Sequence, residues 1–559
     1  MKKVLVFHVV IVAFLLGACA AATPKAPETA GIASAHPLAT AAGHEILAAG
    51  GNAFDAAVAV SAVLGVVEPY ASGLGGGAFW LLHVASEQRD VFLDAREVAP
   101  AAATADMYLD ADGVPIKGAS LNGPLAAGIP GQAAGLVRLS KRYGRLPLSV
   151  SLAPAIRLAE EGFPAHRRLL LGLRFTARTA KRWPAFGEIY SPGGRQVELG
   201  DIIRQPDLAR TLRRFAAGEA DEFYRGETAK LLVEGNRAAG GIWTPEDFDS
   251  YRIVEREPLT FEYEGTRIVS APPPSSGGIA IANILNILDG YDFDALDPVT
   301  RKHLIVEAMR RAYRDRAAYL GDADFVTVPT ARLTDPDYAA GQRVSIRIDR
   351  ATPSETLAGI STPGIKGADT THFSVIDTDG NRVGGTMTIN TWFGAVFMAP
   401  GTGIVLNNEM DDFVIKPMVA NNYGLVGSSA NAIEPGKRPL SSMSPTFLES
   451  DRGVAVLGTP GGSRIISMVL LAAMEWMDGG TAEQMVSLKR YHHQFFPDVI
   501  SFEAGALTSA EQDALEARGH RVSEVKRPFG NMNVVTWDFD SGAVDAATDP
   551  RAPVEGRVY

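Results

Sequence analysis

The stretch D-T-T-H-F-S-V-I-D-T-D-G-N, from Asp369 to Asn381, joins a Thr-Thr pair to the pattern of a strand that ends in a tight turn. A threonine at the start of a chain can be nucleophile and base together, because its own α-amino group, with a pKa of about 7.7 to 8.0, can accept the hydroxyl proton. The stretch therefore has the pattern of a self-cleavage site between Asp369 and Thr370. On these residues alone a plain strand, with Thr370, His372 and Ser374 on one face, is the better explanation.

A hairpin is predicted around this stretch. The segments from His372 to Asp377 and from Val383 to Asn390 have the composition of strands, and Asp379-Gly380 between them is a good hairpin signal. Alternate residues of a strand point the same way, so one face of the second strand carries three polar side chains, those of Thr386, Thr388 and Asn390. If this face meets Thr370, its polar groups reach the same pocket.

Helices and strands elsewhere follow no regular βαβ alternation. Helices are predicted from Leu38 to Ala49 and from Asn52 to Val67, with Asn52 as the N-cap of the second. Later in the chain, apolar residues at i, i+3, i+4 and i+7 predict one buried helix face: Ile305, Ala308, Met309 and Ala312. A strand, a glycine turn and an apolar helix are then predicted over 454–457, 458–462 and 465–477. This mixture favours a layered α/β sandwich.

Composition fits a globular protein with a large core. Of the 559 residues, 46% are hydrophobic and 57 are glycine. The net charge is -11, and no dense run of lysine and arginine of the kind that follows a phosphate backbone is present. Nucleic acid is therefore excluded as an expected partner.

The amino terminus has the features of an export signal. Lys2 and Lys3 precede an apolar run from Val4 to Leu16, which is too short to span a membrane comfortably, and L-L-G-A-C ends at Cys19. Cys19 is the single cysteine, so no internal disulfide is expected, and we predict residues 1–18 as a lipoprotein-type signal with an acylated Cys19. Residues 19–30 would be a tether on a periplasm-facing, membrane-anchored protein. The alternative is an ordinary signal and a soluble periplasmic protein.

Several motifs occur in a fixed order along the rest of the chain. Together with the Thr-Thr-His site they resemble the γ-glutamyltransferase (γ-glutamyltranspeptidase) family of the N-terminal nucleophile hydrolase class. The motifs are E-P-Y-A-S-G-L-G-G-G from Glu68, D-A-R-E-V-A-P from Asp94, P-P-P-S-S-G-G from Pro272, Y-L-G-D-A-D-F from Tyr319, N-N-E-M-D-D-F from Asn407, R-P-L-S-S-M-S-P from Arg438 and G-T-P-G-G-S-R from Gly458.

The resemblance implies a four-layer αββα sandwich built jointly by two subunits, 31–369 and 370–559, that stay associated after self-cleavage. It implies a γ-glutamyl donor such as glutathione, transfer of the γ-glutamyl group to water or to an amino acid or dipeptide, and no cofactor. No metal-binding cluster stands out in the sequence, and His492-His493 is interpreted as a packed or exposed pair.

The family pattern also assigns roles to residues of this chain. Thr370 is the nucleophile, Thr388 orients it, and the amides of Gly461 and Gly462 form the oxyanion hole. Without the family pattern, β propensity alone would explain Thr388. A glycine turn that permits close packing would likewise explain Gly461 and Gly462.

Recognition of a γ-glutamyl group requires a cation for its α-carboxylate and acids for its α-ammonium. By the resemblance, Arg96 with Ser441 and Ser442 binds the carboxylate, and a lid over 416–427 closes with Tyr423. The ammonium is assigned to Asn390, Glu409 and Asp412. Taken singly, each assignment has a structural alternative. Arg96 could form a surface ion pair with Glu97, and Asp411-Asp412 could be a solvated acidic loop. Ser441-Ser442 could form a turn, and the segment 416–427 could be a surface loop with one aromatic residue.

Glu409 stands where several bacterial members have glutamine, which adds negative charge near the ammonium. Two alternative functions remain open from the sequence. One is an acylase for glutaryl-type β-lactam side chains with the same architecture, although Arg96, the serine pair and Asp412 favour an amino-acid substrate. The other is a lipid-anchored binding protein that captures glutamyl compounds without turnover.

Overall fold

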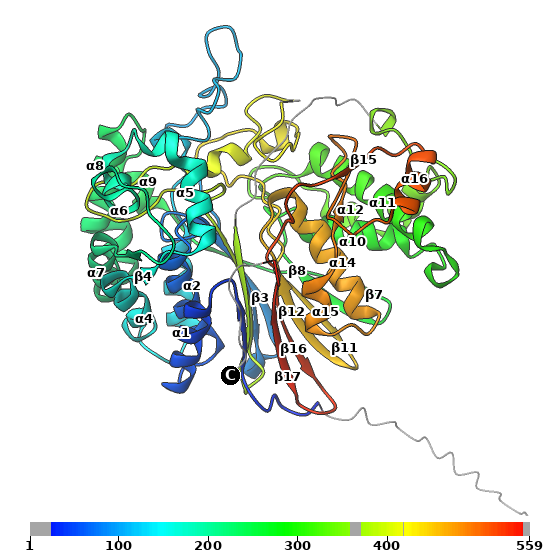
Figure 1. The fold of residues 1–559 in the computed structure, drawn as a ribbon, viewed down its shortest axis with the longest axis horizontal. Helices are drawn as coiled ribbons and strands as arrows, with labels where there is room; N and C mark the ends of the chain where they lie inside the picture. The colour runs from blue at the N-terminus through cyan, green and yellow to red at the C-terminus, as the bar shows by residue number, and fades with distance from the viewer. Residues whose placement is uncertain (1–23, 358–369, 418, 552–559) are drawn as a thin grey trace, which may run out of the picture.

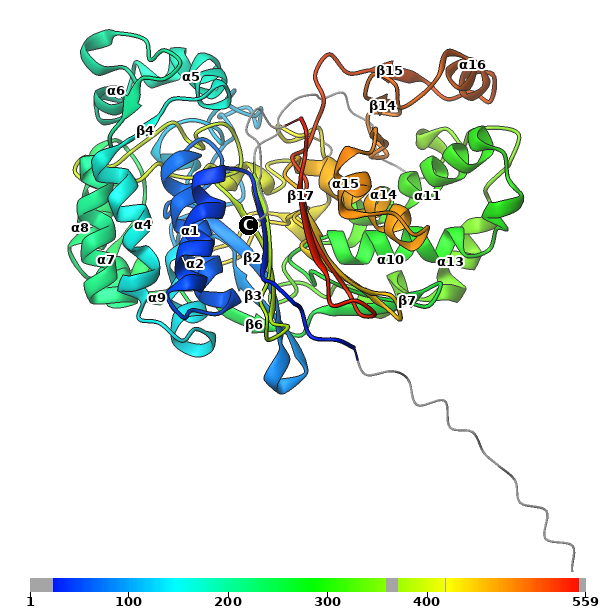
Figure 2. The same ribbon diagram turned by 60° about the horizontal axis from the view of Figure 1, so that its bottom comes forward.

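The computed structural model describes residues 24–357, 370–417 and 419–551. Two six-stranded antiparallel sheets lie face to face, and helices cover the outer side of each sheet (Figure 1 and Figure 2). The predicted four-layer αββα sandwich is confirmed. Within the described ranges, every helix is too short or too polar to cross a membrane.

The first sheet holds the stretch that follows Thr370. Two of its inner strands are β9 and β10, which form the predicted hairpin, and β10 continues the sheet by pairing antiparallel with β2. The strand order is β1 (Gly31–Ser34), β9 (Thr371–Ile376), β10 (Arg382–Thr388), β2 (Gly77–Val84), β3 (Arg89–Ala95) and β6 (Val254–Arg256).

The second sheet packs against the first through β12 and β16, which lie over β9. All its neighbouring strands are antiparallel. The strand order is β17 (Val544–Thr548), β16 (Asn533–Asp538), β12 (Gly453–Gly458), β11 (Thr446–Ser450), β8 (Thr266–Ser270) and β7 (Leu259–Tyr263).

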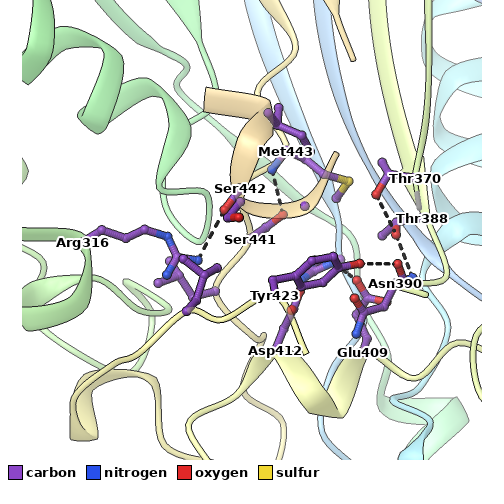
Figure 3. Close-up of a pocket in the computed structure, with 16 residues that line it drawn as sticks. Arg316, Thr370, Thr388, Asn390, Glu409, Asp412, Tyr423, Ser441, Ser442 and Met443 are labelled. Atoms are coloured by element: carbon purple, nitrogen blue, oxygen red, sulfur yellow. Dashed lines mark hydrogen bonds and ion pairs between the residues drawn. The ribbon is translucent and has the colours of Figure 1, made fainter. Parts of the chain in front are cut away.

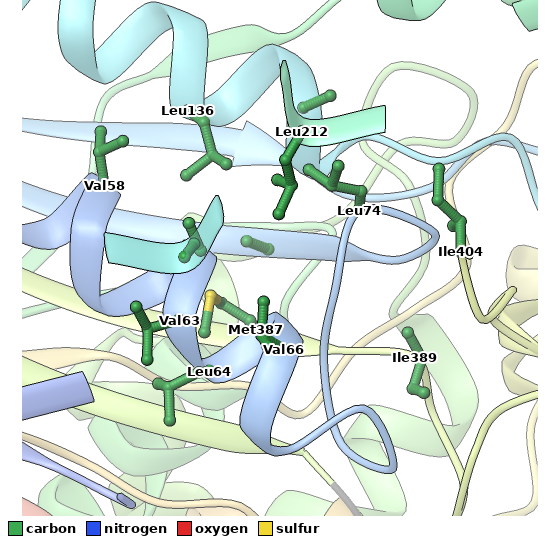
Figure 4. Close-up of a cluster of buried hydrophobic side chains, with 14 of the residues drawn as sticks. Val58, Val63, Leu64, Val66, Leu74, Leu136, Leu212, Met387, Ile389 and Ile404 are labelled. Carbon is green, nitrogen blue, oxygen red and sulfur yellow. The ribbon is translucent and has the colours of Figure 1, made fainter. Parts of the chain in front are cut away.

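One helical layer covers the first sheet. Its central helix α2 is capped as predicted, because the Asn52 side chain accepts hydrogen bonds from the amides of Phe54 and Asp55 at 3.0 and 3.1 Å. Figure 4 shows the apolar side chains of α2 packed toward Met387 of β10. The layer comprises α1 (Pro37–Ala48), α2 (Ala53–Val67), α3 (Gln132–Arg138), α4 (Leu148–Glu161), α5 (Arg167–Ala180), α6 (Pro184–Tyr190), α7 (Pro206–Arg225), α8 (Glu227–Ala238) and α9 (Pro245–Ser250).

The second helical layer covers the other sheet. It contains α10 (Gly277–Leu288), α11 (Pro298–Tyr319), α12 (Thr330–Leu333), α13 (Pro336–Arg343), α14 (Ile465–Met477), α15 (Ala482–Ser487) and α16 (Ser509–Ala517). The short strands β4 (Phe163–Pro164) and β5 (Ile202–Ile203) form one small sheet, and β13 (Tyr491–His492), β14 (Ile500–Phe502) and β15 (Val522–Glu524) form another.

Helix α11 is more deeply buried than its apolar pattern predicts. The predicted apolar face is buried, but Glu307, Arg310 and Arg311 are buried as well. They are tolerated because both guanidinium groups pair with the Glu307 carboxylate, at 3.3 and 2.7 Å.

The segments before and after Thr370 both contribute strands to each sheet. In the first sheet β9 and β10 lie between β1 and β2, and in the second β11 lies between β12 and β8. Part of the predicted tether also joins this structure, since the amides of Lys25 and Glu28 donate to the carbonyls of Phe539 and Gly542 at 3.0 and 2.9 Å. The two segments are therefore interleaved.

Candidate active site

A pocket opens where the start of β9 meets the end of β10, and loops from both layers close around it (Figure 3). All described residues predicted for the site line this pocket except Gly461, which immediately precedes the lining residue Gly462. The predicted Asp369 and Cys19 lie outside the described residues.

Thr370 stands directly before β9 and is buried against the end of β10. Its hydroxyl donates to the Thr388 hydroxyl oxygen across 3.3 Å. The same Thr388 oxygen accepts the amide hydrogen of Asn390 at 2.7 Å, which fixes its position. Because β9 and β10 form one hairpin, the antiparallel register brings the two threonines together.

His372 does not serve the pocket. Its ring lies in the interior between the sheets, where Nδ1 and Nε2 contact the hydroxyl oxygens of Thr386 and Ser374 at 2.8 and 3.1 Å. Burial lowers the pKa of His372 to about 3, so the imidazole is neutral. Thr386, predicted to share the Thr388 face, serves this interior contact instead of the pocket.

The glycine turn lies between β12 and α14. Gly461 and Gly462 have φ values of 151° and 57°, which glycine adopts without strain. The Tyr423 ring lies against Gly462 so closely that a Cβ there would collide with it. Neither glycine amide donates a hydrogen bond to another described residue, and such amides beside a nucleophile can stabilise an oxyanion.

Arg96 lies at the end of the pocket among acidic groups. Its guanidinium pairs with Glu409, with Asp412 Oδ2 at 2.6 Å and with Glu97 Oε2 at 3.7 Å. All four residues are largely or fully buried, so this is no surface ion pair. Burial raises the pKa of Glu97 to about 7 and raises that of Glu409 well above its usual range. The three acidic groups outnumber the single positive charge of Arg96, so a second cation can share them.

Two serine hydroxyls face the pocket from the loop that precedes β11. Ser441 Oγ accepts the Met443 amide hydrogen at 3.1 Å, and Ser442 Oγ accepts from Arg316 Nη2 at 3.4 Å. Within the described chain neither hydroxyl donates, so both hydrogens are available to a ligand. Two adjacent O–H donors with a guanidinium behind them suit a carboxylate.

Arg316 was missed by the sequence analysis. It projects from α11 toward the pocket and also donates through Nε to Ser276 Oγ at 3.0 Å. Within the described residues no carboxylate pairs with it, and burial lowers its pKa to about 10. Its position three residues before the Y-L-G-D-A-D-F motif could have pointed to a role in the site. However, α11 carries several arginines, and the local sequence does not distinguish them.

The segment predicted as a lid contributes Tyr423 to the lining of the pocket. The Tyr423 hydroxyl donates to the Asn390 carbonyl, which joins the lid to the end of β10. Asp411 ties this segment to Ser120 through two hydrogen bonds: its carboxylate accepts from the Asn422 amide at 2.9 Å and from Ser120 Oγ at 2.7 Å. Asp411 is therefore not a solvated acid, and burial raises its pKa to about 6.

One group outside the pocket has metal-ligand residue types: His303, Glu307 and His520. Its atoms are already paired in a chain of hydrogen bonds from Arg310 through His520 and His303 to the Arg347 carbonyl. Glu307 is neutralised by two arginines, so the group fits a structural network better than a cation site.

A threonine nucleophile at the head of an inner strand of an αββα sandwich, beside a glycine turn with two available amides, defines an N-terminal nucleophile hydrolase. The gamma-glutamyltranspeptidase family model matches residues 39–559. This chain belongs to the γ-glutamyltranspeptidase family. The predicted family, enzyme class and γ-glutamyltransferase function are confirmed, and the alternative of a non-catalytic binding protein is set aside.

Two relatives agree with this assignment by name, and one solved structure of a different named activity shares the fold. The chain is 45% identical over 510 residues, 90% of this chain and 88% of the relative, to a glutathione hydrolase proenzyme from Pseudomonas sp. strain A14. It is 40% identical over 99% of its length, and 98% of the relative, to the protein of the same name from Escherichia coli K12. The structure of a cephalosporin acylase from Bacillus halodurans superposes with a TM-score of 0.82 at 28% identity, over 97% of this chain and 98% of that one.

Proposed function

We propose that this chain cuts itself before Thr370 and then cleaves the γ-glutamyl amide of glutathione and related compounds. It would pass the γ-glutamyl group to water or to an amino acid or dipeptide. The observation that carries the proposal is the hydroxyl pair of Thr370 and Thr388 in a pocket that also holds two free serine donors and a surplus of acids. The proenzyme names of the relatives support self-cleavage.

In the processing step the Thr370 hydroxyl oxygen attacks the carbonyl carbon of Asp369. The peptide C–N bond breaks, the acyl group moves to Thr370 Oγ1, and the freed nitrogen becomes the α-amino group. Water then hydrolyses the ester, leaving the Asp369 carboxylate and a free Thr370 hydroxyl. The products are the segment from the mature start to Asp369 and the segment 370–559, which the interleaved sheets keep together.

In the transfer step the α-amino group of Thr370 takes the hydroxyl proton while the oxygen attacks the γ-carbonyl of the donor. The oxyanion points toward the amides of Gly461 and Gly462, where loss of one donor costs on the order of 3 kcal/mol. The leaving amine takes the proton as the C–N bond breaks, which leaves the γ-glutamyl group as an ester on Thr370. Water or the acceptor amine then attacks this ester, takes the γ-glutamyl group and returns a proton to the Thr370 oxygen. Thr388 fixes the direction of the attacking oxygen.

Donor recognition follows from the charges. The α-carboxylate would accept hydrogen bonds from Ser441 and Ser442, supported by Arg316 and Arg96. The α-ammonium would lie against Glu409 and Asp412, with the Asn390 side chain beside them. The ammonium would share with Arg96 the carboxylates of Glu409 and Asp412.

The test compares anilides of three acids with the purified protein: γ-glutamyl, glutaryl and 4-aminobutanoyl. The proposal expects the γ-glutamyl anilide to react fastest, because the other two lack the ammonium or the carboxylate. Faster release from the glutaryl anilide would instead support the acylase function, which the likeness to the cephalosporin acylase favours. A single full-length band for the wild type on a denaturing gel, as for Thr370→Ala, would reject self-cleavage.

We also propose that the protein is exported and held on a membrane through an acylated Cys19. The proposal is supported by the signal-like residues 1–18 and by the single cysteine. Mass spectrometry of the mature amino terminus tests it. A peptide that starts at Cys19 with acyl groups is expected, and an unmodified terminus would reject the anchor.

A further inference from the structure

The motif Y-H-H-Q-F-F, from Tyr491 to Phe496, carries a side chain that touches two parts of the active site. Gln494 follows β13 and is half-buried. Its Oε1 accepts from Ser463 Oγ at 2.6 Å, and Ser463 is the residue after the glycine turn. Its Nε2 donates to the Tyr423 carbonyl at 3.1 Å, and Tyr423 is the lid residue that covers the pocket.

The orientation of the Gln494 amide is fixed by its surroundings. Nε2 also donates to the Phe496 carbonyl at 3.1 Å, so two carbonyl oxygens face the NH₂ group. Oε1 lies 2.9 Å from Nε2 of His492 and also accepts from Ser463. A flipped amide would put oxygen against two carbonyls, so this hydrogen-bond set permits one orientation.

His492 supports this arrangement from behind. Its Nδ1 lies 2.8 Å from the Ser467 hydroxyl in the first turn of α14, and that hydroxyl also lies 2.9 Å from the Arg464 carbonyl. Because Gln494 Oε1 can only accept, the orientation of the Gln494 amide requires the ring hydrogen on Nε2 and leaves Nδ1 as an acceptor for Ser467. Burial lowers the pKa of His492 to about 3, which keeps the ring neutral with one hydrogen. The helix that follows the oxyanion turn thus holds Gln494 through His492.

We propose that Gln494 is a positioning residue that couples closure of the lid at Tyr423 to the geometry of the oxyanion turn at Gly461 and Gly462. The Tyr423 ring lies on Gly462, and the Tyr423 hydroxyl reaches the Asn390 carbonyl. The lid therefore contacts the turn directly and is tied to it again through Gln494. The inference rests on the proposed γ-glutamyl transfer.

Gln494→Glu is the informative change because it keeps shape and acceptor atoms but removes both donors. As a carboxylate it faces the carbonyls of Tyr423 and Phe496 and repels them. When protonated, it regains one O–H donor for a carbonyl. The matched control is Gln512→Glu in α16, since Gln512 is also half-buried and donates through Nε2 to a backbone carbonyl, that of Leu507 at 3.2 Å, away from the pocket.

The measurement is kcat and KM for a γ-glutamyl anilide between pH 5.5 and 8.5, each value divided by that of the wild type at the same pH. At pH 8.5 we expect kcat/KM of Gln494→Glu to fall roughly tenfold or more, as for two lost hydrogen bonds. The ratio should recover several-fold at pH 5.5, where the new carboxyl binds a proton. Gln512→Glu should stay near the wild type throughout.

Fragment formation on a denaturing gel separates this role from a folding defect, because Gln494→Glu should still yield both fragments. A Gln494→Glu ratio that is independent of pH, or near unity at pH 8.5, would overturn the inference. If the wild type itself released no γ-glutamyl group, the proposed function would fail first. Gln494→Met, which has no donor, should be slow at every pH, and its recovery at low pH would also contradict the inference.

Discussion

The Thr388 hydroxyl oxygen accepts two hydrogen bonds, one from the Thr370 hydroxyl at 3.3 Å and one from the Asn390 amide at 2.7 Å. Because the backbone amide fixes the acceptor, the acceptor in turn fixes the nucleophile. We expect Thr388→Ala to lower kcat for a γ-glutamyl anilide by roughly 10- to 100-fold, with little change in KM. Thr388→Ser keeps the hydroxyl and should retain most activity. Equal losses in both variants would contradict this role.

The Arg96 cluster predicts a large effect on stability. Arg96→Gln leaves Glu97, Glu409 and Asp412 without their cation, which should cost about 3–5 kcal/mol in unfolding free energy. Adding Glu409→Gln removes one of the acids and should restore part of the stability but not the activity. Thermal unfolding measures both.

A surface pair serves as the control for that measurement. Arg157 pairs with Glu45 at 2.7 Å with both side chains nearly half exposed. Arg157→Gln should therefore cost less than about 1 kcal/mol. A similar loss for Arg96→Gln and Arg157→Gln would mean that the Arg96 cluster is solvated.

Product binding should depend on pH. Burial raises the pKa of Glu97 to about 7, and Glu97 shares Arg96 with Glu409, so below pH 7 the cluster tends to hold a proton. An ammonium favours the ionised acids, and therefore the inhibition constant of L-glutamate should fall as pH rises from about 5.5 to 7.5, by at most about tenfold per unit for one proton. Glu409→Gln should flatten this slope. A constant value in the wild type would argue against ammonium binding at this cluster.

The serine pair predicts a change in selectivity. Ser442→Ala removes a hydroxyl that Arg316 leaves free to donate, so its effect should appear only with donors that carry the α-carboxylate. We expect kcat/KM to fall about 5- to 20-fold for the γ-glutamyl anilide. The rate with the 4-aminobutanoyl anilide should change little. Comparable losses with both anilides would show that Ser442 has no part in carboxylate binding.

Elements that depend on local sequence were predicted well. Helix α14 has the predicted bounds, Ile465 to Met477, because an apolar run follows a glycine turn. The hairpin of β9 and β10 starts one residue earlier than predicted in each strand, and its turn contains Gly380 with φ of 84° as Asp-Gly indicated. The proximity of Thr370 to Thr388 follows from that hairpin alone.

Contacts between distant parts of the chain could not be predicted from the sequence pattern. The pairing of Arg96 with Glu409 joins residues 313 positions apart, and the sequence assigned them to opposite ends of the substrate. Arg316 looked like any other arginine of its helix. Gln494 was passed over beside the histidine pair, because its role depends on two loops that meet only in the folded chain.

The interleaving of segments before and after Thr370 has a kinetic consequence. Before cleavage, refolding is a unimolecular process at any concentration. Once the backbone is cut, neither piece can complete a sheet, since β9 and β10 must enter between β1 and β2. Recovery from full denaturation then becomes second order and slows on dilution. The cleaved enzyme should therefore regain activity poorly at low concentration, whereas an uncleavable Thr370→Ala chain should recover its native fold independently of dilution.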